Sequence, residues 1–218
     1  MTAQLAEAPG RKTDMSNQGD IQAEYQRLGH TLGWRFLTCP EKNIGTASVA
    51  LITINPGGAS FQAPKWSVEG GSAYAIESWR GCDPGKENLQ RQVIRMFEIM
   101  DVKPDRVLSG YLVPFRSQDW NKLPKKSDSL RFGISLWREI FERTKVQTIT
   151  AFGKATAPYL TNILGASFHA SHPAGWGTQT IDEYLFGSNR RLLVLPHLSR
   201  FRLFGRLQSE IRFRAAIT

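Results

Sequence analysis

Four short apolar runs, each followed by a turn that carries polar residues, constrain the fold of this chain more than any other feature. They are rich in β-branched residues and cover residues 47–54, 106–113, 147–152 and 191–195. Nearly continuous apolar runs of this length are typical of strands covered on both faces. We therefore expect a central four-stranded, mostly parallel sheet.

Segments with helical periodicity separate these runs. Apolar side chains recur every three or four residues in 21–37, 88–100 and 129–141, and a further helix is expected to end at Leu164. A closing helix is predicted after the last strand, with Leu203, Leu207 and Ile211 in register. Strands that alternate with helices predict an α/β fold, here a three-layer α/β/α sandwich.

Length and composition indicate one folded unit. The 218 residues can bury one core but are few for two enzyme domains. Residues 1–20 contain few large apolar side chains, so we expect a disordered tail followed by a single domain over 21–218. No apolar run reaches the ~18 residues of a membrane span, and we expect a cytoplasmic monomer, nucleoid-associated in a prokaryote.

The chain carries 28 Lys and Arg against 19 Asp and Glu, and the basic excess is concentrated near the C-terminus. Residues 190–218 hold seven arginines and a single acid, Glu210. Such a segment suits a phosphate backbone, although a solvated basic face is the alternative. Cys39 and Cys82 lack the spacing of a disulfide framework or a metal site, so we expect free thiols, no metal and no cofactor.

The turns after the four strands are expected to meet, because ligands in parallel α/β sheets bind outside the carboxyl ends of the strands. None of these turns matches a phosphate-binding loop, a nucleophile elbow or a dinucleotide fingerprint. Asparagine, histidine, aromatic and basic side chains occupy them instead. This set suits the cleavage of an activated glycosidic bond better than acyl or hydride transfer.

The order of these turns resembles the uracil-DNA glycosylase superfamily. Residues 54–58 (Ile-Asn-Pro-Gly-Gly) are similar to the first motif of its asparagine-containing mismatch-specific uracil and thymine glycosylases, and Trp66 lies where those enzymes carry a base-stacking aromatic. Residues 114–116 and 152–154 resemble the second and third strand ends, and 196–199 (Pro-His-Leu-Ser) the histidine motif. The iron–sulfur cysteines of some branches are absent from the sequence.

The resemblance implies a DNA-repair enzyme that extrudes a damaged base and hydrolyses its N-glycosidic bond. Asn55 would orient the attacking water, and His197 would donate a hydrogen bond to the base carbonyl as negative charge develops. The expected substrate-binding residues are Ile54, Pro56, Gly57, Gly58, Trp66, Phe115 and Ser199. Gly57 stands where uracil-specific relatives have a tyrosine, so the pocket is expected to admit 5-substituted bases.

The expected DNA contacts come from basic side chains and one apolar wedge. Lys154 and the arginines would bind phosphates, while Phe201 would fill the gap in the duplex or else pack beneath the last helix. These predicted DNA-binding residues are Arg116, Lys154, Arg200, Phe201 and Arg202.

Several alternatives remain open on sequence alone. His172, in a segment expected to be a loop, competes with His197 as the motif histidine because a proline follows it. The chain could instead act on free nucleosides or nucleotides, or be a catalytically silent nucleic-acid-binding relative. A lyase step is not expected, because only Lys154 could supply an amine.

Overall fold

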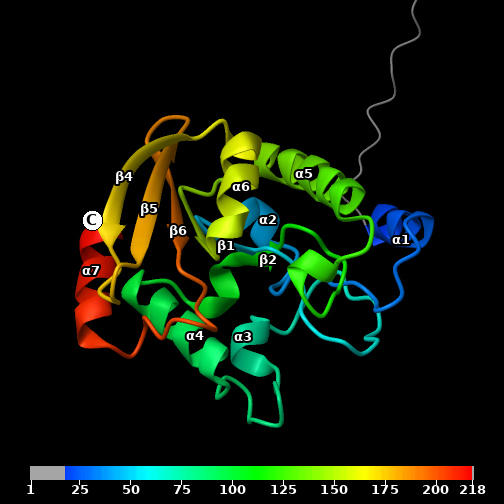
Figure 1. Ribbon diagram of the computed structural model, residues 1–218, viewed down its shortest axis with the longest axis horizontal. Coiled ribbons are helices and arrows are strands. Elements are labelled where there is room, and N and C mark those ends of the chain that lie inside the picture. The colour runs from blue at the N-terminus through cyan, green and yellow to red at the C-terminus, as the bar shows by residue number, and fades with distance from the viewer. Residues whose placement is uncertain (1–17, 218) are drawn as a thin grey trace, which may run out of the picture.

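The sheet has six strands in the order β2-β1-β3-β6-β5-β4 (Figure 1). The structure is a computed structural model that describes residues 18–217. Four neighbouring strands are parallel, and they are the four that the apolar runs predict. Their bounds are Val49–Thr53 (β1), Leu108–Tyr111 (β2), Thr148–Phe152 (β3) and Arg190–Leu195 (β6). The predicted α/β class with a mostly parallel sheet is therefore confirmed.

Helices pack on both faces of this sheet. One apolar cluster joins it to α4 (Asn88–Ile99) and α7 (Leu207–Ile217), and the other to α1 (Gln18–Arg27), α5 (Lys126–Glu142) and α6 (Ala157–Leu164). This two-sided cover explains why the central strands are apolar throughout. The remaining elements are short: α2 (Asn43–Thr46), α3 (Ala73–Ile76), and the 3-10 turns η1 (Pro104–Arg106), η2 (Trp120–Lys122) and η3 (Lys154–Thr156).

The sheet is larger than expected because an antiparallel hairpin extends it beyond β6. Strands β4 (Ser167–Pro173) and β5 (Thr180–Phe186) pair with each other, and β5 also pairs with β6. The segment around His172 is therefore a strand and not the expected loop. As the edge strand, β4 is mostly exposed and polar, so it lacks the apolar run that reveals a covered strand.

The first predicted helix is wrong in its second half. Helix α1 ends at Arg27, and Gly29 and Gly33 both have positive φ, which breaks the helical path. Trp34 and Leu37 then form bridges to Phe115 and Gly110 at the border of the sheet. The expected tail is also too long, because residues 18–20 belong to α1; the rest of it lies outside the described residues.

The closing helix exposes the face that periodicity assigns to the core. Leu207 and Ile211 are 76% and 49% exposed, whereas Phe213 and Ala216 are buried. The helix begins only at Leu207, so Leu203 packs from the preceding loop and does not share its helical register. Glu210 is held there by Arg95, whose guanidinium donates two hydrogen bonds to it.

The connections change direction between β1 and β3. The chain leaves β1 toward α4 on one face of the sheet, and leaves β3 toward α6 on the other face. Neighbouring parallel strands whose connections diverge in this way form a topological switch point, where ligands bind in open α/β sheets. Between residues 18 and 217, no helix has the length and apolar character that spanning a membrane requires.

Candidate functional site

The strand register brings the turns after β1, β3 and β6 together. Ile52 pairs with Ala151, and Ala151 pairs with Val194. Three residues beyond this row stand Asn55, Lys154 and His197. Because β3 separates β1 from β6, the turns of Asn55 and His197 are two strand spacings apart, roughly 10 Å between backbones.

Asn55 is held by its amide nitrogen. This atom donates a hydrogen bond to Ser117 Oγ at 2.8 Å, and longer ones to the carbonyls of Phe115 and Pro56 at 3.3 Å. Ser117 is fixed in turn, since its hydroxyl donates to the carbonyl of Asp119. No hydrogen bond to Asn55 Oδ1 is present among residues 18–217, so this oxygen can accept one from a water.

The Gly57-Gly58 turn rests on Arg116. The guanidinium donates to Gly57 O and to Gln62 Oε1, and a Cβ at Gly58 would lie 2.9 Å from Arg116 Nη1. Gly58 also has a φ of +129°, which L side chains rarely adopt. Arg116 was expected to contact a phosphate, but it is only 8% exposed and packs beneath the turn. Burial also lowers the pKa of its guanidinium.

His197 has a defined tautomer. Its Nδ1 accepts a hydrogen bond from the backbone N–H of Ser199 at 3.3 Å, and Ser199 Oγ lies 2.8 Å away. A backbone N–H can only donate, so Nδ1 carries no proton and the neutral ring carries it on Nε2. Burial first, and then the charge of Arg200, lower the pKa of His197, which keeps the ring neutral at pH 7.

The ring of His197 leans toward the switch point. A Cβ on Gly153, directly after β3, would lie 3.1 Å from His197 Cδ2. The imidazole thus covers the end of the strand that separates it from β1. Within the described chain, Nε2 has no hydrogen-bond partner, so its N–H is available to a ligand.

Trp66 lies near the border of β2. Its ring is half-buried and packs on Phe36 at 5.0 Å between centroids. Its carbonyl accepts a hydrogen bond from Leu37, whose own bridge is to Gly110 in β2. Ile54 and Pro56 contribute backbone contacts, since their carbonyls accept from Val113 and Ser117.

Two aromatic side chains that were predicted to contact the base or the DNA pack against other parts of the protein. Phe115 has no exposed surface, and its ring stacks against His30 and Phe132 in the core, so it offers no wall to a pocket as it stands. Phe201 is half-buried and packs edge-on against Trp176, which corresponds to the packing alternative and not to a free wedge.

The predicted phosphate contacts divide into paired and unpaired side chains. Lys154 forms an ion pair with Asp182 of β5 at 2.5 Å, a partner in the hairpin that the sequence analysis missed. Arg200 and Arg202 are exposed, and in the described part of the chain neither has an ion pair or a side-chain hydrogen bond.

His172 stands apart from the turns after β1, β3 and β6, which carry Asn55, Lys154 and His197 and which we call the rim. It lies on β4, four strand spacings from β1, or about 19 Å. Its Nε2 lies 2.9 Å from Glu183 Oε2, so this ring nitrogen already pairs with a neighbouring carboxylate. The geometry therefore favours His197 over His172 as the partner of Asn55.

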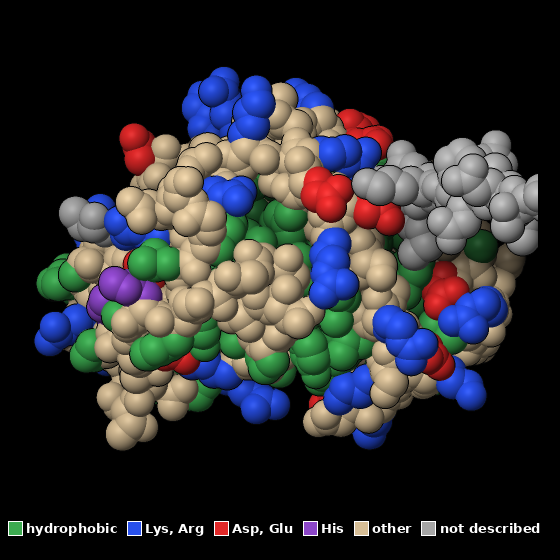
Figure 2. Space-filling model, turned by 90° about the horizontal axis from the view of Figure 1, so that it is seen from above, with side chains coloured by type: hydrophobic (Ala, Val, Ile, Leu, Met, Phe, Trp, Pro, Cys, Tyr) green, Lys and Arg blue, Asp and Glu red, His purple; other side chains and the backbone are tan. Residues whose placement is uncertain are grey.

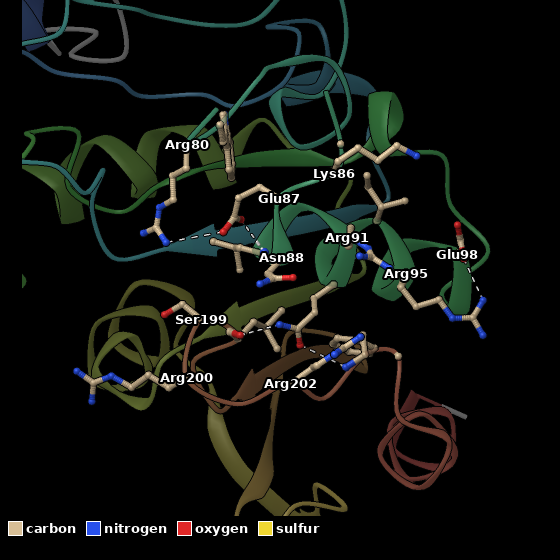
Figure 3. Close-up of a pocket in the computed structure, with 18 of the residues that line it drawn as sticks. Arg80, Lys86, Glu87, Asn88, Arg91, Arg95, Glu98, Ser199, Arg200 and Arg202 are labelled. Atoms are coloured by element: carbon tan, nitrogen blue, oxygen red, sulfur yellow. Dashed lines mark hydrogen bonds and ion pairs between the residues drawn. The ribbon is translucent and has the colours of Figure 1, made fainter. Parts of the chain in front are cut away.

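A pocket of about 900 Å³ lies beside the rim, between α4 and the loop of residues 198–205 (Figure 3). We call it the α4 groove. Gln92 joins its two walls: its Nε2 donates to Leu198 O at 2.7 Å, and its Oε1 accepts from Phe204 N. Ser199 lines the groove, whereas Asn55 and His197 do not.

Sequence reasoning missed Ser117, Gln92 and the basic residues on the α4 side of this groove, whereas it did predict Arg200 and Arg202. Ser117 directly follows residues 114–116, which resemble the second strand end of the superfamily, and Arg91 and Arg95 are spaced four residues apart on one helix. Nothing in the sequence singles out Gln92, because a lone glutamine in an amphipathic helix is expected on the solvent-exposed face.

Cys39 and Cys82 are free thiols, and residues 18–217 contain no cluster of three or more His, Cys, Asp or Glu side chains that could hold a metal. No protein-family model matches the chain, and no curated protein matches it significantly.

Proposed function

We propose that this chain is a monofunctional DNA glycosylase of the uracil-DNA glycosylase superfamily. It hydrolyses the N-glycosidic bond of uracil or a related deaminated or 5-substituted base in DNA, as a monomer in the cytoplasm. The observation that carries the proposal is the rim between β1 and β6. There, within residues 18–217, the His197 Nε2–H and the Asn55 Oδ1 have no hydrogen-bond partner, while the rest of each side chain is held.

The leaving base requires stabilisation of negative charge. When the C1′–N bond breaks, its electron pair moves onto the base and partly onto the carbonyl oxygen beside the bond. A neutral Nε2–H aimed at that oxygen stabilises this charge without giving up its proton. The fixed acceptor role of His197 Nδ1 and the lowered pKa support this form of the ring.

The sugar requires a nucleophile on its opposite side. As the bond breaks, C1′ becomes cation-like and is attacked by water, which then loses a proton to solvent. Asn55 is not a base, but its Oδ1 can align this water while Ser117 holds its amide nitrogen. The open turn at Gly57 leaves space beside the base for a 5-substituent.

The test is an excision assay on oligonucleotides that contain uracil, hypoxanthine, xanthine or a thymine mismatch, in single- and double-stranded form. The expected product is an alkali-labile abasic site, lost in Asn55→Ala and His197→Ala. Asn162→Ala and His169→Ala are matched controls, because both side chains are exposed and lie away from the rim.

Two rival functions predict different products. A hydrolase or transferase of free nucleosides would act on small molecules and show no salt-sensitive DNA binding. A silent relative would bind DNA in a salt-dependent way but release no base. Base excision that persists in both rim variants would remove these residues from the mechanism.

A further inference from the structure

The α4 groove concentrates positive charge. Six basic side chains line it against two acidic ones. Arg80 and Arg95 are paired with Glu87 and Glu98, at 3.8 and 2.9 Å. The other four have no ion pair within residues 18–217: Lys86, Arg91, Arg200 and Arg202.

These unpaired cations come from two segments that face each other. Figure 3 shows Lys86 and Arg91 on the side of α4, with Arg200 and Arg202 across the groove on the loop that follows His197. On the face in Figure 2, by contrast, basic side chains are dispersed and several stand beside acidic ones. Like charges gathered in one groove repel each other, so the groove favours a ligand with several negative charges in series.

Aromatic side chains accompany the charges. Trp79 and Trp176 line the groove, and both are half-buried. The indole N–H of Trp79 donates to Glu77, which holds the ring in place, and the guanidinium of Arg206 covers one face of Trp176. Cations interleaved with aromatic rings are the composition of grooves that bind single-stranded nucleic acid, where bases stack and phosphates pair with Lys and Arg.

The groove adjoins the rim through Ser199 and is linked to the Trp66 segment through Glu77. Ser199 lines the groove and also fixes Nδ1 of His197. Glu77 joins the other side: it accepts from Trp79 in the groove and from Lys65, the neighbour of Trp66. A strand lying in the groove would therefore pass Ser199, next to the His197 ring proposed to bind the extruded base.

We propose that the α4 groove binds the single-stranded DNA that flanks the target nucleotide, so that the protein acts on unpaired DNA in preference to duplex. This inference rests on the proposed function and adds its substrate class. A volume of about 900 Å³ is near the upper end of roughly 300–1,000 Å³ for small-ligand pockets, enough for a few nucleotides.

The test is the binding of lesion-free, fluorescently labelled DNA, measured by anisotropy as salt is varied. The variant is Arg91→Glu/Arg202→Glu, which reverses one charge on each wall. The matched control is Arg106→Glu/Lys145→Glu. These exposed residues precede β2 and β3, so they lie at the amino ends of the strands, opposite the carboxyl ends that form the rim. Arg91→Gln/Arg202→Gln repeats the test if charge reversal impairs folding.

Wild type should bind the single strand more tightly than the matching duplex. The groove variant should lose roughly tenfold or more in affinity for it, and its salt slope should become shallower by about 1.4, or 0.7 for each lost phosphate contact. The control should remain near wild type. Equal losses in both variants, unchanged binding in the groove variant, or tighter binding of duplex would each overturn the inference.

The same measurement separates this inference from the proposed function. Lesion-free DNA is bound but not cleaved, so binding can be measured in Asn55→Ala as well as in wild type. Groove-dependent binding without any excision would support the inference and reject the glycosylase. Excision with groove-independent binding would do the reverse.

Discussion

The rim and the α4 groove adjoin each other but are built in opposite ways. At the rim, the side chains of Asn55 and His197 are both held by hydrogen bonds, and in each one polar atom has no partner among the described residues. In the groove, Arg91 and Arg202 extend from exposed positions without ion pairs in the described chain. Fixed groups suit a reacting bond, which requires a narrow range of geometries, whereas exposed cations without ion pairs suit a flexible polyanion.

The largest expected effect is a kinetic separation of the two regions. His197→Ala should lower the excision rate at saturating DNA by about 10²–10³-fold, as the loss of one donor to a developing oxyanion does, with little change in DNA affinity. Arg91→Glu/Arg202→Glu should weaken DNA binding and leave the saturated rate within about threefold. Single-turnover kinetics over a range of protein concentrations measures both quantities. A loss of DNA affinity in His197→Ala equal to that of the groove variant would contradict the assignment of separate roles to the rim and the groove.

The next effect concerns Gln92, which joins the groove to the histidine loop. Gln92→Leu leaves the carbonyl of Leu198 and the N–H of Phe204 without their partner, so the loop should loosen. The expected loss of stability is about 1–3 kcal/mol, measured by chemical denaturation. Because Gln92 acts through the loop, the saturated excision rate should fall by roughly tenfold while affinity falls less.

Gln147→Leu is the control for this substitution, because Gln147 is exposed at the amino end of β3. If Gln92→Leu were destabilised but kept its full excision rate, the histidine loop would not depend on α4 for its position.

A smaller effect should appear in the pH profile. The pKa of His197 is lowered from 6.5, by burial and then by Arg200. The ring is thus neutral above that lowered pKa, and excision should be flat near pH 7 and fall only at more acidic pH. Protonation would place a proton on Nδ1, where it meets the N–H of Ser199. Arg200→Ala removes one cause of the shift, so the acid limb of the single-turnover profile should move to higher pH; a limb that stays in place would contradict this assignment.

How much of this site the sequence could predict depends on which residues carried a pattern. The covered strands and the turns that hold Asn55 and His197 follow from apolar runs and their endings. The hairpin of β4 and β5 does not, because an exposed edge strand is polar. The burial of Arg116 and Phe115 depends on Gln62, His30 and Phe132, which are distant in sequence and carry no motif.

Only one wall of the α4 groove could be predicted from the sequence. The arginines after β6 stand out by composition, but their partners on α4 are scattered among residues of an ordinary amphipathic helix. Only the packing of α4 beside that loop, fixed by Gln92, brings the two sets of charges together.

The smallest expected effect is on stability and concerns Glu77, which links Trp79 of the groove to Arg35 and Lys65. Burial alone would raise its pKa, but hydrogen bonds from Arg35 and Lys65 outweigh burial and bring the pKa to about 2. A lowered pKa means that the carboxylate stabilises the fold above its unfolded pKa of ~4.3 and that this contribution is lost as the pH falls toward 2. Glu77→Gln should cost about 1–2 kcal/mol at pH 7, with the difference from wild type shrinking below pH 4.5. Thermal melts from pH 7 to pH 3 measure this; a constant difference would contradict it.

The central claim is that Asn55 and His197 act on the same nucleotide, and a double-mutant cycle tests it most directly. Single-turnover excision of uracil from a single-stranded oligonucleotide is measured for wild type, Asn55→Ala, His197→Ala and the double variant. The account predicts large losses in both single variants and a loss in the double variant well short of their product, because the two residues stabilise one transition state. Wild-type protein that leaves the uracil in place, or single variants that excise it at the wild-type rate, would contradict the account.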